Sequence, residues 1–155
     1  MNIRLETADQ PEVLRLIEEL DAYQMPLYPA ESHHGIDIRA LVQPNVLFAV
    51  MRDENKFAFG CGAVVIGSAY GELKRMFIRP SFRGKGASKI LLSFLENMAI
   101  DKGCRYFTLE TGISQPEALG LYERCGYSRC EPFGDYQPDP FSVFMHKRIL
   151  SGAKQ

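Results

Sequence analysis

The sequence predicts a single domain of mixed α/β class. Its 155 residues suit one domain, because a compact chain of about this length buries roughly 70% of its unfolded surface. Hydrophobic residues make up 46% of the chain and charged residues 24%, as in ordinary globular proteins. Segments with the alternating pattern of strands are interleaved with segments of helical periodicity. We expect residues 1–150 to form this domain and residues 151–155 to form a C-terminal tail.

The first half of the chain is predicted to hold three strands and two helices. In order, these are a strand over 2–6, a helix from an Asp9 N-cap to about residue 22, a loop over 24–35, a short helix over 36–42, and strands over 46–52 and 56–66. In the long helix, apolar residues recur at helical spacing, at Val13, Leu14, Ile17 and Leu20. The last two strands flank a turn over residues 53–55, which indicates a hairpin.

The second half begins with a strand and a glycine-rich turn and continues into the strongest predicted helix. The expected order is a strand over 72–78, the turn over 83–86, a helix ended by Lys102-Gly103, a strand over 104–111, a helix over 115–124, and strands over 127–129 and 141–147. An apolar stripe marks the first of these helices, at Ile90, Leu91, Phe94, Leu95, Met98 and Ala99. Gly126 ends the second helix, and a loop rich in proline and glycine separates the last two strands.

Charge, termini and cysteines exclude several classes of protein. The formal charge of −1 disfavours nucleic-acid binding, which needs a strong basic surplus. The N-terminus lacks the apolar core of a secretory signal, and no apolar stretch is long enough to cross a membrane. The four cysteines form no Cys-x-x-Cys pair, so we expect reduced thiols, no metal site and a cytoplasmic protein.

The sharpest local motif is Arg83-Gly84-Lys85-Gly86-Ala87-Ser88, between a predicted strand and a predicted helix. A helix N-terminus offers free backbone N–H groups and a partial positive charge, and glycines let an anion approach the backbone closely. The motif therefore favours a phosphate site as much as a plain tight turn. It does not match a dinucleotide fingerprint, because position 89 is Lys, and no P-loop string occurs.

Two motifs in this sequence resemble the GNAT family (GCN5-related N-acetyltransferases), and specifically a small bacterial single-domain member. The glycine turn resembles the family pattern Gln/Arg-x-x-Gly-x-Gly/Ala, with Ser88 at the last small position. Residues 115–127 resemble Asn-x-x-Ala-x-x-Leu-Tyr-x-x-x-Gly-Phe, with Gln115 where Asn is commoner. The resemblance covers nearly the whole chain. It implies a mostly antiparallel sheet of six to seven strands with splayed central strands, flanked by about four helices.

The resemblance implies acetyl-CoA as co-substrate, bound where the central strands part. The backbone of Met76, Phe77 and Ile78 would pair with the pantetheine arm as an added strand does. Amides of the glycine turn would hold the pyrophosphate. The cofactor-binding residues expected on this basis are Met76, Phe77, Ile78, Arg83, Gly84, Lys85, Gly86, Ala87, Ser88, Lys89 and Gln115.

The implied reaction is attack of a primary amine of a small molecule or amino acid on the thioester, within a ternary complex. An amine of pKa about 10 is mostly protonated at neutral pH and needs a base. Two carboxylates match base positions in the family, Glu72 and Glu110, and the sequence does not choose between them. Tyr122 matches the family's general acid for the departing thiolate.

The sequence says less about the residues that contact the acceptor amine than about those that bind the co-substrate. The expected contacts are Tyr28, in a loop after the first helix, Arg75, on the cofactor strand, and Tyr136, in the late loop. The alternatives are a peptide or protein N-terminal acetyltransferase and a non-catalytic CoA-binding module. Neither the acceptor nor the acyl chain is specified, and a homodimer is expected only because small family members often form one.

Overall fold

The computed structural model describes residues 1–29 and 37–150. Its seven strands are β1 (Asn2–Leu5), β2 (Val46–Arg52), β3 (Ala58–Ile66), β4 (Gly71–Ile78), β5 (Tyr106–Gly112), β6 (Ser128–Cys130) and β7 (Ser142–Arg148). Its α-helices are α1 (Pro11–Gln24), α2 (Ile38–Leu41), α3 (Ala87–Asp101) and α4 (Pro116–Arg124). Short 3-10 turns cover Met25–Leu27 and Pro80–Phe82. The expected tail over 151–155 and the start of the second predicted helix lie outside the described residues.

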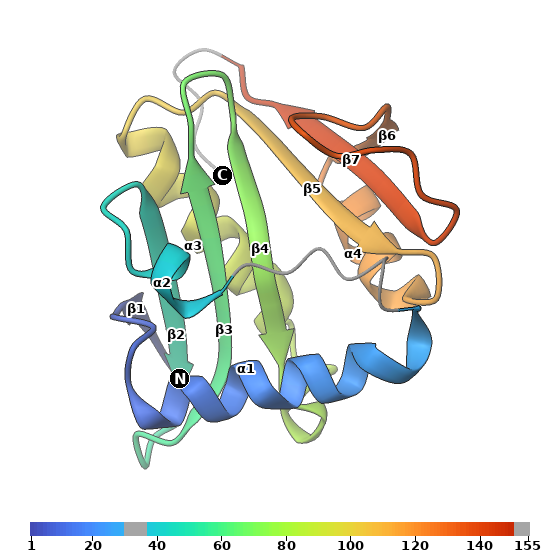
Figure 1. Cartoon of the computed structure of the whole chain (residues 1–155). Coiled ribbons are helices and arrows are strands. Elements are labelled where there is room, and N and C mark those ends of the chain that lie inside the picture. The colour runs from blue at the N-terminus through green and yellow to red at the C-terminus, as the bar shows by residue number, and fades with distance from the viewer. Residues whose placement is uncertain (30–36, 151–155) are drawn as a thin grey trace.

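The strands form one sheet in the order β1-β2-β3-β4-β5-β7-β6, as Figure 1 shows. All neighbouring pairs are antiparallel except β4 and β5. The mixed, mostly antiparallel sheet with four described helices therefore confirms the predicted fold class.

Helices cover both faces of the sheet, which explains why β2 and β3 are apolar over nearly their whole length. Alternate residues of β2 belong to two separate cores: Ala49 and Met51 pack with α3, whereas Phe48 and Val50 pack with α1 and α2. In Figure 1, α1 crosses the front of the sheet while α3 lies behind it. The site described below lies at β4 and β5, in the middle of the strand order.

The parallel pair β4–β5 is the structural feature that opens the sheet. Its pairing covers only Gly71–Leu73 with Phe107–Leu109, after which the two strands part. Beyond this point, β4 continues beside β3, and β5 stays paired with β7 along its whole length. The expected splay of the central strands is therefore present.

An irregularity in β4 lies just after the point of divergence. Arg75 has φ of +55°, in the left-handed region that non-glycine residues rarely adopt. The register between β3 and β4 shifts at the same level, between Cys61 and Ala63. The extra residue makes a β-bulge, which breaks the alternation of side chains between the two sheet faces.

Candidate active site

Two cavities meet where β4 and β5 separate. The first, here the glycine-turn cavity, has a volume of about 530 Å³ and reaches from β4 to the N-terminus of α3 and to α4. The second, here the acidic cavity, has a volume of about 480 Å³ and lies between α1, β4 and β5. The residues that line both are Leu20, Met76, Gln115, Ala118 and Tyr122. These residues form the boundary across which two bound molecules would meet.

The glycine-turn cavity gathers most of the residues expected to bind the co-substrate. The predicted residues that line it are Met76, Phe77, Ile78, Arg83, Gly84, Gly86, Ala87, Ser88, Lys89 and Gln115. Lys85 is exposed and lies outside this lining. The turn thus contributes its backbone together with the side chains of Arg83 and Lys89, whereas the charge of Lys85 lies outside the cavity.

The glycine turn has the conformation that an anion site at a helix start requires. Gly84 and Gly86 have φ of +80° and +79°, and Gly86 is the N-cap of α3. No atom lies within 4 Å of the place where a Cβ would stand on either glycine. The Arg83 side chain is fixed by a 2.8 Å bond from Nε to the Ile78 carbonyl. The open backbone at the start of α3 therefore fits a phosphate group.

The edge of β4 beside this cavity fits an extended ligand. β4 is bound to β3 through Phe77 and Ile78, but its pairing with β5 ended at Leu73. Over Met76–Ile78, the edge of β4 that faces away from β3 therefore borders the cavity and does not pair with β5. An extended chain with amide groups, such as a pantetheine arm, can be added at such an edge.

Tyr122 lies at the boundary between the cavities and is 7% exposed. It comes from α4, and its ring packs edge-on against Tyr127 with centroids 5.8 Å apart. Burial, together with the nearby Cys125, raises the pKa of Tyr122 above its ordinary value of 10. Its phenol therefore keeps its proton through the neutral range.

Both predicted glutamates line the acidic cavity, but their partners differ. The Glu72 carboxylate accepts a 2.7 Å hydrogen bond from the Tyr136 hydroxyl and lies 3.3 Å from Lys74 Nζ. Lys74 Nζ also donates to the Tyr136 hydroxyl at 2.7 Å. Burial and the bond to Glu72 raise the pKa of Tyr136. Tyr136 thus bridges an acid and a cation on β4.

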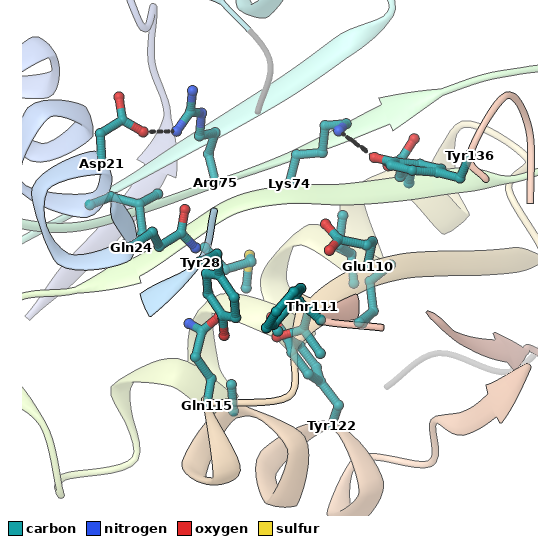
Figure 2. Close-up of a pocket in the computed structure, with 18 of the residues that line it drawn as sticks. Asp21, Gln24, Tyr28, Lys74, Arg75, Glu110, Thr111, Gln115, Tyr122 and Tyr136 are labelled. Atoms are coloured by element: carbon teal, nitrogen blue, oxygen red, sulfur yellow. Dashed lines mark hydrogen bonds and ion pairs between the residues drawn. The ribbon is translucent and has the colours of Figure 1, made fainter. Parts of the chain in front are cut away.

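The Glu110 carboxylate accepts a 2.7 Å hydrogen bond from the Ser142 hydroxyl of β7. The contact follows from the register, because Glu110 faces Phe144 across the ladder and Ser142 precedes Phe144 by two residues. Figure 2 shows Glu110 rising from β5 beside Tyr122, with Lys74 and Tyr136 across the cavity. Sequence reasoning missed Ser142, because only the pairing of two distant strands reveals it.

Gln115 and Tyr28 hold each other at the cavity boundary. The Tyr28 hydroxyl donates a 3.1 Å hydrogen bond to Gln115 Oε1. Burial raises the pKa of Tyr28, so its hydroxyl remains a donor at neutral pH. The Tyr28 ring lies against Gly112, where any Cβ would collide with it. Tyr28 lines the acidic cavity, and Gln115 lines both cavities while its side chain accepts from Tyr28.

Arg75 lines the acidic cavity and forms an ion pair with Asp21 of α1. Its neighbour Lys74 also lines this cavity, and it was missed in the sequence. A signal was available, because Lys74 stands two residues after Glu72 and so shares its face of a regular strand.

Over 1–29 and 37–150, no three His, Cys, Asp or Glu side chains gather as a metal ion would require. In the same ranges no helix is both long enough and apolar enough to pass through a bilayer.

Comparison with known proteins identifies the family. Residues 12–127 match the family described as Acetyltransferase (GNAT) family. The chain is 42% identical to the IAA acetyltransferase of Azospirillum brasilense over 151 residues, which cover 96% of this chain and 98% of that protein. It is 34% identical to the uncharacterized N-acetyltransferase YsnE of Bacillus subtilis, covering 96% of this chain and 100% of that protein.

A solved structure agrees with these relatives. The putative acyl-CoA N-acyltransferase from Klebsiella pneumoniae superposes with a TM-score of 0.82 at 36% identity, covering 96% of this chain and 97% of that one. Its fold and the matched family together account for the splayed strands, the glycine turn and the tyrosine between two cavities. The chain belongs to the GNAT family of acetyl-CoA-dependent N-acetyltransferases.

Proposed function

We propose that this enzyme moves the acetyl group of acetyl-CoA directly to a primary amine of a small molecule or amino acid, with both substrates bound at once. The observation that carries this proposal is the position of Tyr122, which lines the glycine-turn cavity and the acidic cavity together. A thioester held on one side of Tyr122 would meet an amine held on the other side. The relative named IAA acetyltransferase supports a small acceptor.

Glu110 is the base in this proposal. At neutral pH about one alkyl amine in a thousand is unprotonated, so a base must take a proton from the bound ammonium group. Glu72 already accepts from the Tyr136 hydroxyl and lies beside the Lys74 cation, so its carboxylate is engaged in holding two side chains of the cavity wall. Glu110 is held instead by the neutral Ser142 hydroxyl. Because Glu72 is taken up by its two contacts, we assign the base to Glu110, which also lines the acidic cavity.

The bond changes balance as follows. The amine nitrogen forms a bond to the carbonyl carbon of the thioester, and the C–S bond breaks to release the thiolate of coenzyme A. Glu110 takes one proton from the bound ammonium group and releases it to solvent, and it then takes the second proton, which the nitrogen loses after attack. Tyr122 gives its proton to the sulfur, whose conjugate acid has a pKa near 8.5, well below that of the buried phenol. Tyr122 then regains its own proton from solvent.

Coenzyme A is proposed to lie along the glycine-turn cavity. The Met76–Ile78 edge of β4 would pair with the pantetheine arm, and the amides at Gly84 and Gly86 would bind the pyrophosphate. Arg83 and Lys89 add positive charge at the same end. Expectations of a cytoplasmic location and of a homodimer stay predictions.

Two measurements test this function. Titration calorimetry with acetyl-CoA should show one site per chain, and a folded protein that gives no heat of binding would defeat the co-substrate assignment. A thiol-release assay over amines, amino acids and peptides then tests transfer. Release with small amines supports the proposal. Release with peptides alone favours a peptide acetyltransferase, and release at the rate of background hydrolysis throughout favours a non-catalytic CoA-binding module.

A further inference from the structure

The carbonyl oxygen of the thioester needs a hydrogen-bond donor in the proposed reaction. This oxygen gains negative charge as the amine attacks, and a donor fixed beside it lowers the barrier to transfer. The donor must stand where the two cavities meet, because the acetyl group would lie between the two bound molecules. Of the residues that line both cavities, three have apolar side chains and one is Tyr122. The remaining one is Gln115, whose amide can donate.

The Gln115 side chain does not cap its own helix. Gln115 is the N-cap of α4, a position from which a short polar side chain bonds to the first free N–H groups of the helix, but its side chain makes no such bond. Its backbone is nonetheless fixed. The Gln115 N–H donates to the Gly112 carbonyl at 3.2 Å, and its carbonyl accepts from the Leu119 N–H at 3.1 Å. The amide group therefore stands on a fixed backbone and lines both cavities.

Tyr28 determines which end of this amide is left for a ligand. The Tyr28 hydroxyl donates to Gln115 Oε1 at 3.1 Å, and in Figure 2 its ring points toward Gln115. Hydrogen bonds from Ser114 lower the pKa of Tyr28 against the effect of burial, as donors to the phenolic oxygen do. With its oxygen engaged by Tyr28, the amide offers a ligand its NH2 group, which can only donate. Such a group suits a carbonyl oxygen and cannot bind an ammonium ion.

Gly112 of β5 makes room for the Tyr28 side chain. A Cβ on Gly112 would collide with the Tyr28 ring and hydroxyl, whereas the backbone there has no positive φ that would itself require glycine. Tyr28 follows α1 in the chain, and Gln115 lies between β5 and α4. Their hydrogen bond therefore joins the segment after α1 to the start of α4, beside the place where β4 and β5 separate.

We propose that the Gln115 amide donates a hydrogen bond to the carbonyl oxygen of the thioester, and that Tyr28 is the positioning residue that holds the amide in this orientation. This inference rests on the proposed acetyl transfer and adds the group that polarises the carbonyl. Because the oxygen becomes more negative as the amine attacks, the bond strengthens in the transition state and acts mainly on kcat. Gln115 keeps its protons throughout, so the proton transfers of Glu110 and Tyr122 are unchanged.

The first test measures how far each variant lowers kcat, with single-turnover rates confirming that chemistry is limiting. Gln115→Met keeps the length of the side chain and removes the donor, so kcat should fall about 10²-fold and the KM for acetyl-CoA should change about threefold or less. Tyr28→Phe keeps the ring but frees the amide, and kcat should fall about tenfold. A loss confined to the KM for acetyl-CoA overturns the carbonyl contact.

Tyr106→Phe is the matched control for Tyr28→Phe. It also removes a tyrosine hydroxyl from a hydrogen bond, here one of 2.7 Å with His146, but Tyr106 lies outside both cavities. Its kcat should stay within about twofold of wild type, as for a substitution away from the site. If Tyr106→Phe and Tyr28→Phe lower kcat equally, the positioning role of Tyr28 is overturned.

Two further variants test whether Tyr28 acts through Gln115. In a Gln115→Met background, Tyr28→Phe should lower kcat no further, because the amide that it orients is gone. An equal loss in both backgrounds overturns the positioning role. Gly112→Ala, whose Cβ displaces Tyr28, should lower kcat at least as much as Tyr28→Phe. A folded Gly112→Ala protein with wild-type kcat would overturn it as well.

A spectroscopic readout separates this inference from the proposed function. Infrared difference spectra of acetyl-CoA labelled with carbon-13 at the acetyl carbonyl, bound without an acceptor, report on hydrogen bonding to that oxygen. A donor lowers the C=O stretching frequency, so the frequency should be lower on the wild-type protein than on Gln115→Met or Tyr28→Phe. This result would support the inference even if no amine were acetylated. Equal frequencies on the wild-type protein and Gln115→Met would overturn it and leave the proposed acetyl transfer standing.

Discussion

Tyr122 has surroundings that suit one half of an acid–base pair. The residue is 7% exposed, and burial raises its pKa, so the phenol is protonated over the whole neutral range. A group in this state can donate a proton and cannot collect one from an amine. Glu110 and Glu72 line the same cavity as Tyr122, and a carboxylate can accept a proton, so they suit the opposite task. The two residue types thus divide the proton transfers between them.

Replacing Tyr122 with Phe should lower kcat about 10²-fold or more, the usual range for losing a positioned acid. The ring still fills the same space, so the KM for acetyl-CoA should stay within about twofold of wild type. Single-turnover measurements check that the chemical step limits the rate. A variant with wild-type kcat under those conditions would remove Tyr122 from the mechanism.

The two glutamates are separable by matched substitutions. Glu110→Gln should lower kcat about 10²-fold or more, while Glu72→Gln should cost much less and act mainly through KM for the acceptor, because Glu72 holds Tyr136 and Lys74. Ser142→Ala, which frees Glu110 from its 2.7 Å bond, should lower kcat several-fold with the acetyl-CoA KM unchanged. The reverse order of the two glutamate variants would give the role of base to Glu72.

Among the elements, α1 and the first strands are joined by one arginine. Arg52, at the end of β2, bonds to Glu6 at 2.9 Å and to Glu12 of α1 at 2.7 Å. Its side chain is 13% exposed, and its partners stand on two other segments of the chain. The bond to Arg52 is the main reason that the pKa of Glu6 is lowered. This contact fixes the start of the helix whose other end lines both cavities.

Replacing Arg52 with Met should therefore lower the free energy of unfolding by about 2 kcal/mol, because it leaves the partly buried Glu6 carboxylate without its cation. Urea denaturation measures the change. Arg4→Met is the matched control, since exposed Arg4 bonds to its neighbour Asn2, and it should change stability by about 0.5 kcal/mol or less. Equal losses in the two variants would refute a special role for the Arg52 group.

Element types were predictable from sequence wherever periodicity was strong. The helix with the apolar stripe from Ile90 to Ala99 is α3, and the hairpin strands are β2 and β3. Boundaries were wrong by a few residues, as at β5, which begins at Tyr106 rather than at 104. The 3-10 turns over Met25–Leu27 and Pro80–Phe82 went unpredicted, because a single turn has no period to detect.

The residues of the candidate site could be predicted where a sequence motif determines the backbone, and could not be predicted at the β-bulge of β4. Local motifs single out the glycine turn and Tyr122, and the structure brings both to the lining of one cavity. The bulge at Arg75 has no sequence signal, because arginine is not a residue that favours positive φ. Lys74 could therefore not be recognised as the neighbour of Arg75 in one cavity.

For the molecule as a whole, the divergence of β4 and β5 opens a site and also leaves the two halves of the sheet connected over a short stretch. Only three residue pairs, Gly71–Leu73 with Phe107–Leu109, connect the β1–β4 half of the sheet to the β5–β7–β6 half. A buried polar group made of Glu96, Tyr127 and Lys147 links the two halves. Glu96 of α3 is 1% exposed, accepts a 2.6 Å bond from the Tyr127 hydroxyl and lies 3.2 Å from Lys147 of β7. Tyr127 in turn packs on Tyr122, so this group also supports the site.

Burial of Glu96 makes stability depend on pH in a direction that can be measured. Burial raises its pKa above 4.5, and the bonds from Tyr127 and Lys147 only partly oppose this. A carboxyl group whose folded pKa is raised contributes stability that is fully present below the unfolded pKa. That stability is lost as pH rises through the folded pKa. Gln at this position cannot titrate, so Glu96→Gln removes this pH dependence.

The stability of Glu96→Gln minus that of wild type should therefore increase as pH rises from about 4 to 7. Denaturant unfolding at several pH values measures the two curves, and their difference cancels the titration of all other groups. The substitution also replaces a carboxylate oxygen near Lys147 with an amide nitrogen, and this costs stability. Because low pH neutralises Glu96 in wild type, that cost is the same at every pH, so it shifts the stability difference and leaves its slope against pH unchanged. A flat or falling difference would mean that Tyr127 and Lys147 outweigh burial. The group would then act as an ion pair holding the two halves of the sheet together.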